Sequence, residues 1–431
     1  MEHDLKTICR DLPSFSWWLF GGCAQQGRTH MHFEQVIQAR LLDGRRKTHQ
    51  PAGGRLARDH SDADALRQRI NRAYLSDWDD DLVRSRLHAV AMISVPEAVA
   101  LVVDDTGILK KGKKSPGVHR QYTGTAGKVA NCQVVVSTHV ASHAASVPLE
   151  MDLYVPNVWC EDAERRAGAW IPEELEFRTK PELALEQIDR ILDRGGAPEF
   201  VLADAGYGDN SEFREALVER GLGYAVGVKR TVVIWRPGEG PEPAAPSEGP
   251  EGRPPRMFPG THEPISILDF ALEVPEEAWH DVELRPGAPN PRMCRFTAHR
   301  IRTASRARAG KPPGREQWLL IQWPADADAP SHYFLMTSPA NTSIEQLART
   351  AKLRWRVERD YQDIKGEVGF THYEGRRYRG FQHHLTICMA AIAFMVASRA
   401  LFPPQPSPNP RRAGSTPPVA LDLDPGPLPV L

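Results

Sequence analysis

The chain has 431 residues, of which 41% are hydrophobic and 25% charged, a balance typical of a folded soluble protein with two or three structural units. Its 54 Lys and Arg against 55 Asp and Glu give a formal net charge of −1, which excludes a histone-like polycation and leaves any nucleic-acid binding to local patches. The six cysteines are scattered without a C-x-x-C pair, which indicates reduced thiols and argues against a disulfide framework or a zinc site.

The first 95 residues predict a helical N-terminal region with an accessory or DNA-binding role. Residues 1–30 contain an apolar knot around Trp17 that has no clear period, and they receive no assignment. From Phe33 to Ile93 the pattern is helical and highly charged, with acids ahead of arginines, which suits the helix dipole. The N-terminus lacks the layout of a signal peptide, so we expect a cytoplasmic protein.

Residues 96–229 read as alternating buried strands and helices. The expected strands lie at 98–104, 131–141, 149–155, 199–203 and 223–228, and the expected helices at 181–194 and 211–220. Three hairpin-connected strands followed by α/β crossovers is the chain order of the ribonuclease H-like fold. The sequence therefore predicts an α/β protein built on a mixed five-stranded sheet.

Residues 230–340 interrupt this pattern and predict a β-rich insertion. A Pro/Gly-rich stretch at 236–260 comes first and is followed by strand-like pieces at 264–270, 293–299, 316–323 and 333–337, with a basic loop at 300–315.

The last part of the core, 341–402, is expected to hold one long helix over 343–367. The apolar run 385–398 is shorter than a bilayer span and predicts a buried core helix. The Pro-rich tail, 403–431, is expected to be disordered.

Acidic residues follow two of the predicted strands. Asp104, Asp105 and Thr106 come at the end of the first strand, and Asp204 at the end of the fourth. In a ribonuclease H-like sheet these strands are central neighbours, so their ends meet. Two carboxylates placed together repel each other unless a divalent cation neutralises them, and oxygen ligands suit Mg²⁺ or Mn²⁺.

A third acid is expected on the long helix. Arg354, Glu358 and Lys365 are separated by four and then seven residues, and at about 100° per residue they project from one helical face. A carboxylate between two cations suits a site that holds both metal and phosphate, with Glu358 on the metal and Arg354 and Lys365 on the phosphate backbone.

Four runs carry a resemblance to a known family: VVDDTGILKKGKK, QYTGTAGKVANCQV, LADAGYGD and LRWRVERDYQDIKGEVGF. Together they resemble DDE transposases of bacterial insertion sequences, with the insertion sequence 701 group of the insertion sequence 4 superfamily as nearest kin. The family implies a Y-x2-R-x3-E-x6-K signature on its catalytic helix, and this chain has Ala351 at the Tyr position. It also favours Asp105, directly before Thr106, as the first acid. Strand alternation lets only one of Asp104 and Asp105 face the site, so Asp104 is the alternative.

The resemblance implies cut-and-paste DNA transposition. Two Mg²⁺ ions, or Mn²⁺, would be held by Asp105, Asp204 and Glu358, and the freed 3′-OH would attack target DNA. The implied partners are the terminal inverted repeats and target DNA, not a membrane, with a dimer in the synaptic complex at the bacterial nucleoid. Two other hypotheses are a catalytically silent DNA-binding descendant and a structure-selective nuclease.

Two basic segments are further candidates for phosphate contact. Four lysines, at 110, 111, 113 and 114 (Lys110, Lys111, Lys113 and Lys114), lie in a stretch from Thr106 to Leu149 that has no acidic residue. Arg376, Arg377 and Arg379 follow the catalytic helix and form either a DNA contact or a surface turn. The close pairs His30/His32 and His383/His384 have no further soft ligands and are expected to be structural.

Overall fold

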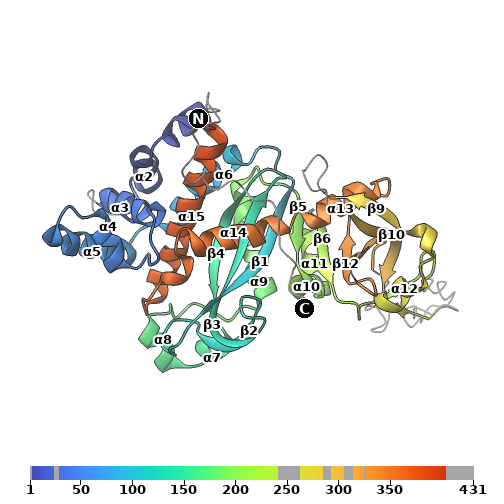
Figure 1. Ribbon diagram of the computed structural model, residues 1–431. Coiled ribbons are helices and arrows are strands. Elements are labelled where there is room, and N and C mark those ends of the chain that lie inside the picture. Colours follow the sequence, from blue (N-terminus) through green and yellow to red (C-terminus); the bar gives the residue numbers. More distant parts are fainter. Residues whose placement is uncertain are drawn as a thin grey trace, which may run out of the picture.

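The computed structural model describes residues 2–23, 29–240, 263–284, 293–304, 314–324 and 327–403. The Pro-rich tail beyond residue 403, and most of the Pro/Gly-rich and basic loops of the insertion, lie outside these ranges. The described chain has a helical N-terminal part, a central mixed sheet with helices, and a β-rich lobe at the end of the sheet away from the N-terminal helices (Figure 1).

The N-terminal part is helical, as expected. Its six helices are α1 (Glu2–Ile8), α2 (Leu12–Phe20), α3 (Thr29–Leu41), α4 (His49–Leu56), α5 (His60–Leu75) and α6 (Asp80–Ser94). Aspartates begin three of them, because the side chains of Asp11, Asp59 and Asp79 accept backbone N–H groups of the first turn. The unassigned apolar knot is α2, which buries Phe15 and Phe20.

Six strands form the central part of the sheet. They are β1 (Ala100–Leu109), β2 (His119–Thr123), β3 (Lys128–Ala141), β4 (Ser146–Tyr154), β5 (Phe200–Ala203) and β6 (Gly223–Val228). β3 lies antiparallel to β1 on one side, and to both β2 and β4 on the other. β1, β5 and β6 are parallel neighbours. The order through the centre is therefore β4-β3-β1-β5-β6.

Helices cover both faces of this sheet. On one face, Leu101 and Val103 of β1 share a core with α9 (Lys180–Arg194), α11 (Ser211–Glu219) and α15 (Tyr378–Leu401). On the other, Ala100 and Val102 share a core with α13 (Ile344–Lys352) and α14 (Trp355–Gly366). The short helices α7 (Asn157–Cys160), α8 (Ala163–Ala169) and α10 (Ala205–Gly208) lie in the connections. Alternate residues of β1 thus face different helices, which decides where its acids point.

The predicted five-stranded sheet is larger than expected, because the insertion extends it. β12 (His332–Met336) pairs antiparallel with β6, and twelve strands of the described residues form one sheet. The other insertion elements are β7 (Val233–Trp235), β8 (Ile265–Ser266), α12 (Ile267–Glu273), β9 (His280–Glu283), β10 (Met293–Thr303) and β11 (Gln317–Trp323). The strand predicted at 264–270 is wrong after Ser266, whose hydroxyl accepts the N–H of Asp269 and begins α12.

The single helix predicted over 343–367 is also wrong, because it breaks into α13 and α14. Arg356 N–H donates to the Leu353 carbonyl and Val357 N–H to the Arg354 carbonyl, so the chain makes tighter i→i+3 bonds there. α15 is longer than the apolar run that predicted it. Its 24 residues could cross a membrane by length and composition, but 61% of its most apolar window is buried inside the protein.

Candidate active site

The first pair of acids lies within β1 and not at its end. The strand was expected to stop at Asp104, but it continues along the long β3 as far as Leu109. The parallel pairing with β5, by contrast, joins only Leu101 and Val102 to that strand. Asp104 therefore lies just beyond the point where the pairing between β1 and β5 ends.

Asp204 follows β5 directly and begins α10. Its Oδ1 accepts the backbone N–H of Gly206 at 2.8 Å, which fixes the carboxylate at the turn from strand to helix. Its negative charge helps raise the pKa values of both Asp104 and Asp105. The three aspartates therefore lie close enough to interact, as the strand order had predicted.

Asp104 faces the α14 side of the sheet. Arg354 Nη1 donates to Asp104 Oδ2 at 3.1 Å, and Arg354 Nη2 donates to Glu358 Oε1 at 2.6 Å. The guanidinium thus bridges the two carboxylates. Lys365 lies further along α14. Burial lowers the pKa of Lys365, the charge of Asp104 opposes this, and Lys365 Nζ donates to Thr125 Oγ1 at 3.0 Å. Of the three residues predicted to share a helical face, Arg354 joins Asp104 to Glu358 through its two ion pairs, whereas Lys365 contacts Thr125.

Asp105 faces the opposite side. Its Oδ2 accepts from Lys180 Nζ at 3.0 Å and from the Tyr207 hydroxyl at 3.4 Å. Lys180 is the first residue of α9 and Tyr207 lies in α10. Neither was singled out from the sequence, although Tyr207 belongs to the LADAGYGD run.

The electrostatics separate the two acids of β1. Burial raises the pKa of Asp104 to about 7, Arg354 opposes this, and the charges of Asp204 and Asp105 add to it. Burial also raises the pKa of Asp105, opposed by Lys180. A carboxylate whose charge is disfavoured by burial and by neighbouring acids is a place where a bound cation would be favourable.

The carboxylate ligands fit a hard divalent cation, but Arg354 occupies the space between two of them. Carboxylate oxygens of the aspartates and Glu358 are the ligands that Mg²⁺ and Mn²⁺ prefer. In the described part of the chain, however, no three acidic, histidine or cysteine side chains converge as a metal-binding group. Arg354 stands between Asp104 and Glu358, so Glu358 could join the aspartates on a metal only after that ion pair opens.

A buried polar network fastens α14 to the sheet. The Tyr361 hydroxyl and Ser137 Oγ lie 2.6 Å apart, and His139 bonds to Ser137 Oγ and to Asp360 Oδ2, each at 2.9 Å. Ser146 Oγ donates to Asp360 Oδ1 at 2.8 Å. Sequence reasoning missed this network, although Ser137 and His139 are polar residues inside an apolar strand run. The network holds α14, which carries Glu358, against β3 and β4.

The predicted phosphate-binding residues divide into two groups. Lys111, Lys113, Lys114 and Arg376 are exposed. Arg377 and Arg379 are exposed as well, but they and the half-buried Lys110 have partners within the protein. Lys110 Nζ donates to the Tyr373 carbonyl at 2.7 Å, Arg377 lies over the Trp170 ring at 4.3 Å, and Arg379 pairs with Asp77 at 3.3 Å. The contact from Lys110 to Tyr373 places the lysine segment beside the arginine segment, and their role on DNA stays a prediction.

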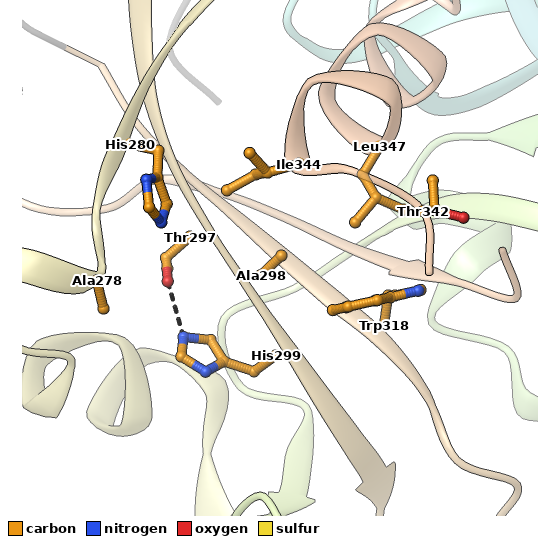
Figure 2. Close-up of a pocket in the computed structure, with 9 residues that line it drawn as sticks. All are labelled: Ala278, His280, Thr297, Ala298, His299, Trp318, Thr342, Ile344 and Leu347. Carbon is orange, nitrogen blue, oxygen red and sulfur yellow. Dashed lines mark hydrogen bonds between the residues drawn. The ribbon is translucent and has the colours of Figure 1, made fainter. Parts of the chain in front are cut away.

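A cavity of about 250 Å³ lies away from these acids, in the insertion. Figure 2 shows its lining by side chains of β9, β10, β11 and the start of α13, including His280, Thr297 and His299. The Thr297 hydroxyl and His299 Nε2 are 2.8 Å apart, so they satisfy each other. None of the candidate acids lines it, and it adds nothing to the site.

A central sheet carrying three interacting aspartates, with an acid-bearing helix against it, agrees with the comparison to known families. Residues 20–291 match the family described as DDE superfamily endonuclease, and the chain belongs to that family. The match includes Asp104, Asp105 and Asp204 and ends before α14, so Glu358 rests on geometry alone.

A curated relative is the "Probable transposase for insertion sequence element IS701" of Microchaete diplosiphon. It is 31% identical to this chain over 156 residues, which make up 36% of this chain. The aligned part spans 38% of the relative's length.

Proposed function

We propose that this protein is a DDE transposase that cleaves DNA at the ends of its own insertion sequence and joins the freed 3′-OH to target DNA. The observation that carries the proposal is the Arg354 bridge between Asp104 and Glu358, with Asp204 close enough to act on the pKa of Asp104. The family membership and the likeness to a probable transposase support it.

The fold supports a ribonuclease H-like core. The order β4-β3-β1-β5-β6, with β3 antiparallel and the last two strands parallel to β1, is the arrangement that the chain order predicted. We assign residues 96–229 and 341–402 to this core, 230–340 to the insertion, 1–95 to the helical N-terminal region and 403–431 to the tail.

We assign the first acid to Asp104, the alternative of the sequence analysis. Asp104 shares Arg354 with Glu358, whereas Asp105 is held by Lys180 and Tyr207 across the strand. The family pattern favours Asp105, so the two variants must be compared directly. In either assignment Asp204 and Glu358 complete the set.

The side chains have distinct tasks in this scheme. Asp104, Asp204 and Glu358 would hold Mg²⁺ or Mn²⁺, which supply Lewis acidity for phosphodiester cleavage and strand transfer. Arg354 holds Glu358 in place before DNA binds. A DNA phosphate can accept two N–H groups of one guanidinium, so a phosphate bound at Arg354 would compete with Glu358 for it and leave Glu358 open. Lys365 places a second positive charge on the backbone.

The partners follow from this chemistry. They are the terminal inverted repeats and the target DNA, and joining two ends requires at least a dimer in the synaptic complex. We expect the protein in the bacterial cytoplasm, at the nucleoid. The exposed lysines and Arg376 would contribute to the salt-dependent part of the affinity.

The experiment is to find the inverted repeats that flank the gene and incubate that DNA with the protein and Mg²⁺. Cleavage at the repeat boundary that is lost in Glu358→Gln supports the proposal, provided that this variant still binds the ends. Cutting of branched DNA without preference for the repeats would support the structure-selective nuclease.

The second candidate is a catalytically silent DNA-binding protein. The observations that favour it are the Arg354 bridge, which occupies Glu358, and Ala351, which is buried in the core where the family has Tyr. End binding without cleavage in either Mg²⁺ or Mn²⁺ would establish this alternative.

A further inference from the structure

The β2–β3 hairpin reaches the candidate site from the lysine-rich side. At its tip, Thr125 Oγ1 donates to the Gly107 carbonyl at 3.1 Å and accepts from Lys365 Nζ at 3.0 Å. The hairpin therefore touches β1 two residues after Asp105 and touches α14 through a residue whose charge acts on Asp104.

The close fit at Gly107 fixes the hairpin in that place. A Cβ atom added to Gly107 would lie 1.9 Å from Thr123 Oγ1 and 2.8 Å from Thr123 Cβ, so only glycine allows this approach. The position of the hairpin beside the acids is thus built into the strand.

The hairpin shows solvent a mixed apolar and basic surface. Tyr122 and Val129 are cross-strand partners, and their side chains are 48% and 53% exposed. Arg120 and Lys128 on the same two strands are also exposed. No acidic residue occurs between Thr106 and Leu149, so the surface has no negative charge of its own.

This combination fits nucleic acid better than a protein partner. A flat aromatic ring offers a stacking surface to any unpaired base, and flanking cations take the adjoining phosphates. A duplex hides its base faces inside the stack, whereas strand ends at a cleavage site expose them. Arg120 lies on the same face of the hairpin as Tyr122, and Lys128 lies beside the turn, so both can meet a polyanion.

We propose that the β2–β3 hairpin binds single-stranded DNA next to the scissile phosphate, with Tyr122 stacked on an unpaired base and Arg120 and Lys128 on the backbone. This inference deepens the proposed function and rests on it for the location of the cut. The binding itself is independent of cleavage.

The test measures the affinity of the full chain for a short labelled single strand of mixed sequence, in EDTA so that no cleavage occurs. Tyr122→Ala is expected to lower the affinity roughly ten-fold, as loss of one stacked base does, whereas Tyr122→Phe keeps the ring and the affinity. The matched control is Trp17→Ala, because Trp17 is another aromatic, 62% exposed, in the helical N-terminal region. Equal affinities of wild type and Tyr122→Ala would overturn the proposal, as would an equal loss in Trp17→Ala.

Two further readouts locate the contact. Lys128→Gln is expected to reduce the salt slope by about 0.7, the value for one phosphate of a single strand, and an unchanged slope would contradict the backbone contact. In end DNA carrying the base analogue 2-aminopurine next to the cut, stacking on Tyr122 should quench the fluorescence, and Tyr122→Ala should restore it. Failure of cleavage with these results intact would overturn the proposed function and leave the hairpin site standing.

Discussion

Two groups of buried charges in this protein use the same residue types and behave in opposite ways. In the arginine cluster (Arg84, Arg190 and Arg194 with Glu150 and Asp152), each acid accepts from at least two arginines. In the candidate site, Asp104, Asp105 and Asp204 lie together, and Asp104 has Arg354 as a partner that it shares with Glu358.

The pKa values record the difference. Burial alone would raise the pKa of Asp152, but Arg84 and Arg190 outweigh it and bring the pKa down to about 2. The pKa of Asp104 instead rises to about 7 because burial and neighbouring acids outweigh Arg354. A cluster in which every buried charge is paired within the protein stabilises the fold. A cluster with an excess of buried carboxylates is suited to binding a cation.

The largest effect is expected at Glu358. Glu358→Gln should lower cleavage of end DNA at least about a thousandfold, because it removes a charged ligand without changing the size of the side chain. Cleavage rates and end affinity are measured in parallel. Asp363→Asn on the same helix is the control, since Asp363 pairs with Arg359 and not with the site. A variant that also loses end binding would show that Glu358 has another role.

The next largest effect is the difference in cleavage between variants of the two acids of β1. Asp104→Asn is expected to lower cleavage strongly, though less than Glu358→Gln, and to keep the stability of the metal-free protein, because it removes a carboxyl whose charge burial disfavours. Asp105→Asn should retain measurable cleavage, since its partners are Lys180 and Tyr207. Rates and urea midpoints of both variants decide the assignment. The reverse order of activities would return the role to Asp105.

In the arginine cluster the same kind of change should destabilise the protein. Asp152→Asn leaves Arg84 and Arg190 short of a buried partner and is expected to cost about 3 kcal/mol in the free energy of unfolding. Urea denaturation measures it. Asp189→Asn, which breaks the half-exposed pair with Arg220, is the control and should cost less than about 1 kcal/mol. Equal costs for the two variants would show that the buried pairs of Asp152 stabilise the fold no more than a surface pair does.

Acid should reveal the same contribution. Because the folded pKa of Asp152 lies below its ordinary value, its charge stabilises the protein above about pH 4, and that stability is lost as the pH falls toward 2. At pH 3 the loss should be about 1 kcal/mol. The free energy of unfolding of wild type and Asp152→Asn, measured at pH 5 and pH 3, isolates it. A constant difference between the two proteins would refute the depressed pKa.

The smallest effect is expected at Lys365. Lys365→Ala should weaken end binding and reduce the salt slope by about one phosphate contact, because Lys365 is a cation at the end of α14 that interacts electrostatically with Asp104. Fluorescence anisotropy over a range of salt concentrations measures it. An unchanged slope would leave Lys365 as a structural partner of Thr125.

The sequence predicted the central strands well, because continuous apolar runs bounded by turns have few other interpretations. It also placed Arg354 beside Glu358, since spacing on a helix is a local property. It did not predict the break between α13 and α14, which follows from a single tightened turn. Nor did it predict that Arg354 would bridge two carboxylates, because that contact joins residues 250 positions apart.

The choice between Asp104 and Asp105 shows the same limit. Alternation along a strand was readable from the sequence, but which face carries α14 depends on tertiary packing. Lys180 was hidden for the same reason, since a lysine at the start of a helix has no local feature that points to an acid on another strand. The His383 and His384 pair was correctly expected to be structural, as each ring bonds to a buried backbone carbonyl.

The pairing of β12 with β6 has a consequence for how this chain could be shortened or rearranged. Hydrogen bonds from Ala225–Val228 to Tyr333–Met336 make the insertion a continuation of the core sheet. Deleting it would leave the backbone of β6 bare along one edge, and an open apolar edge is a template for association between chains. The insertion therefore covers the edge of the central sheet. A truncated protein should aggregate before its activity can be assayed.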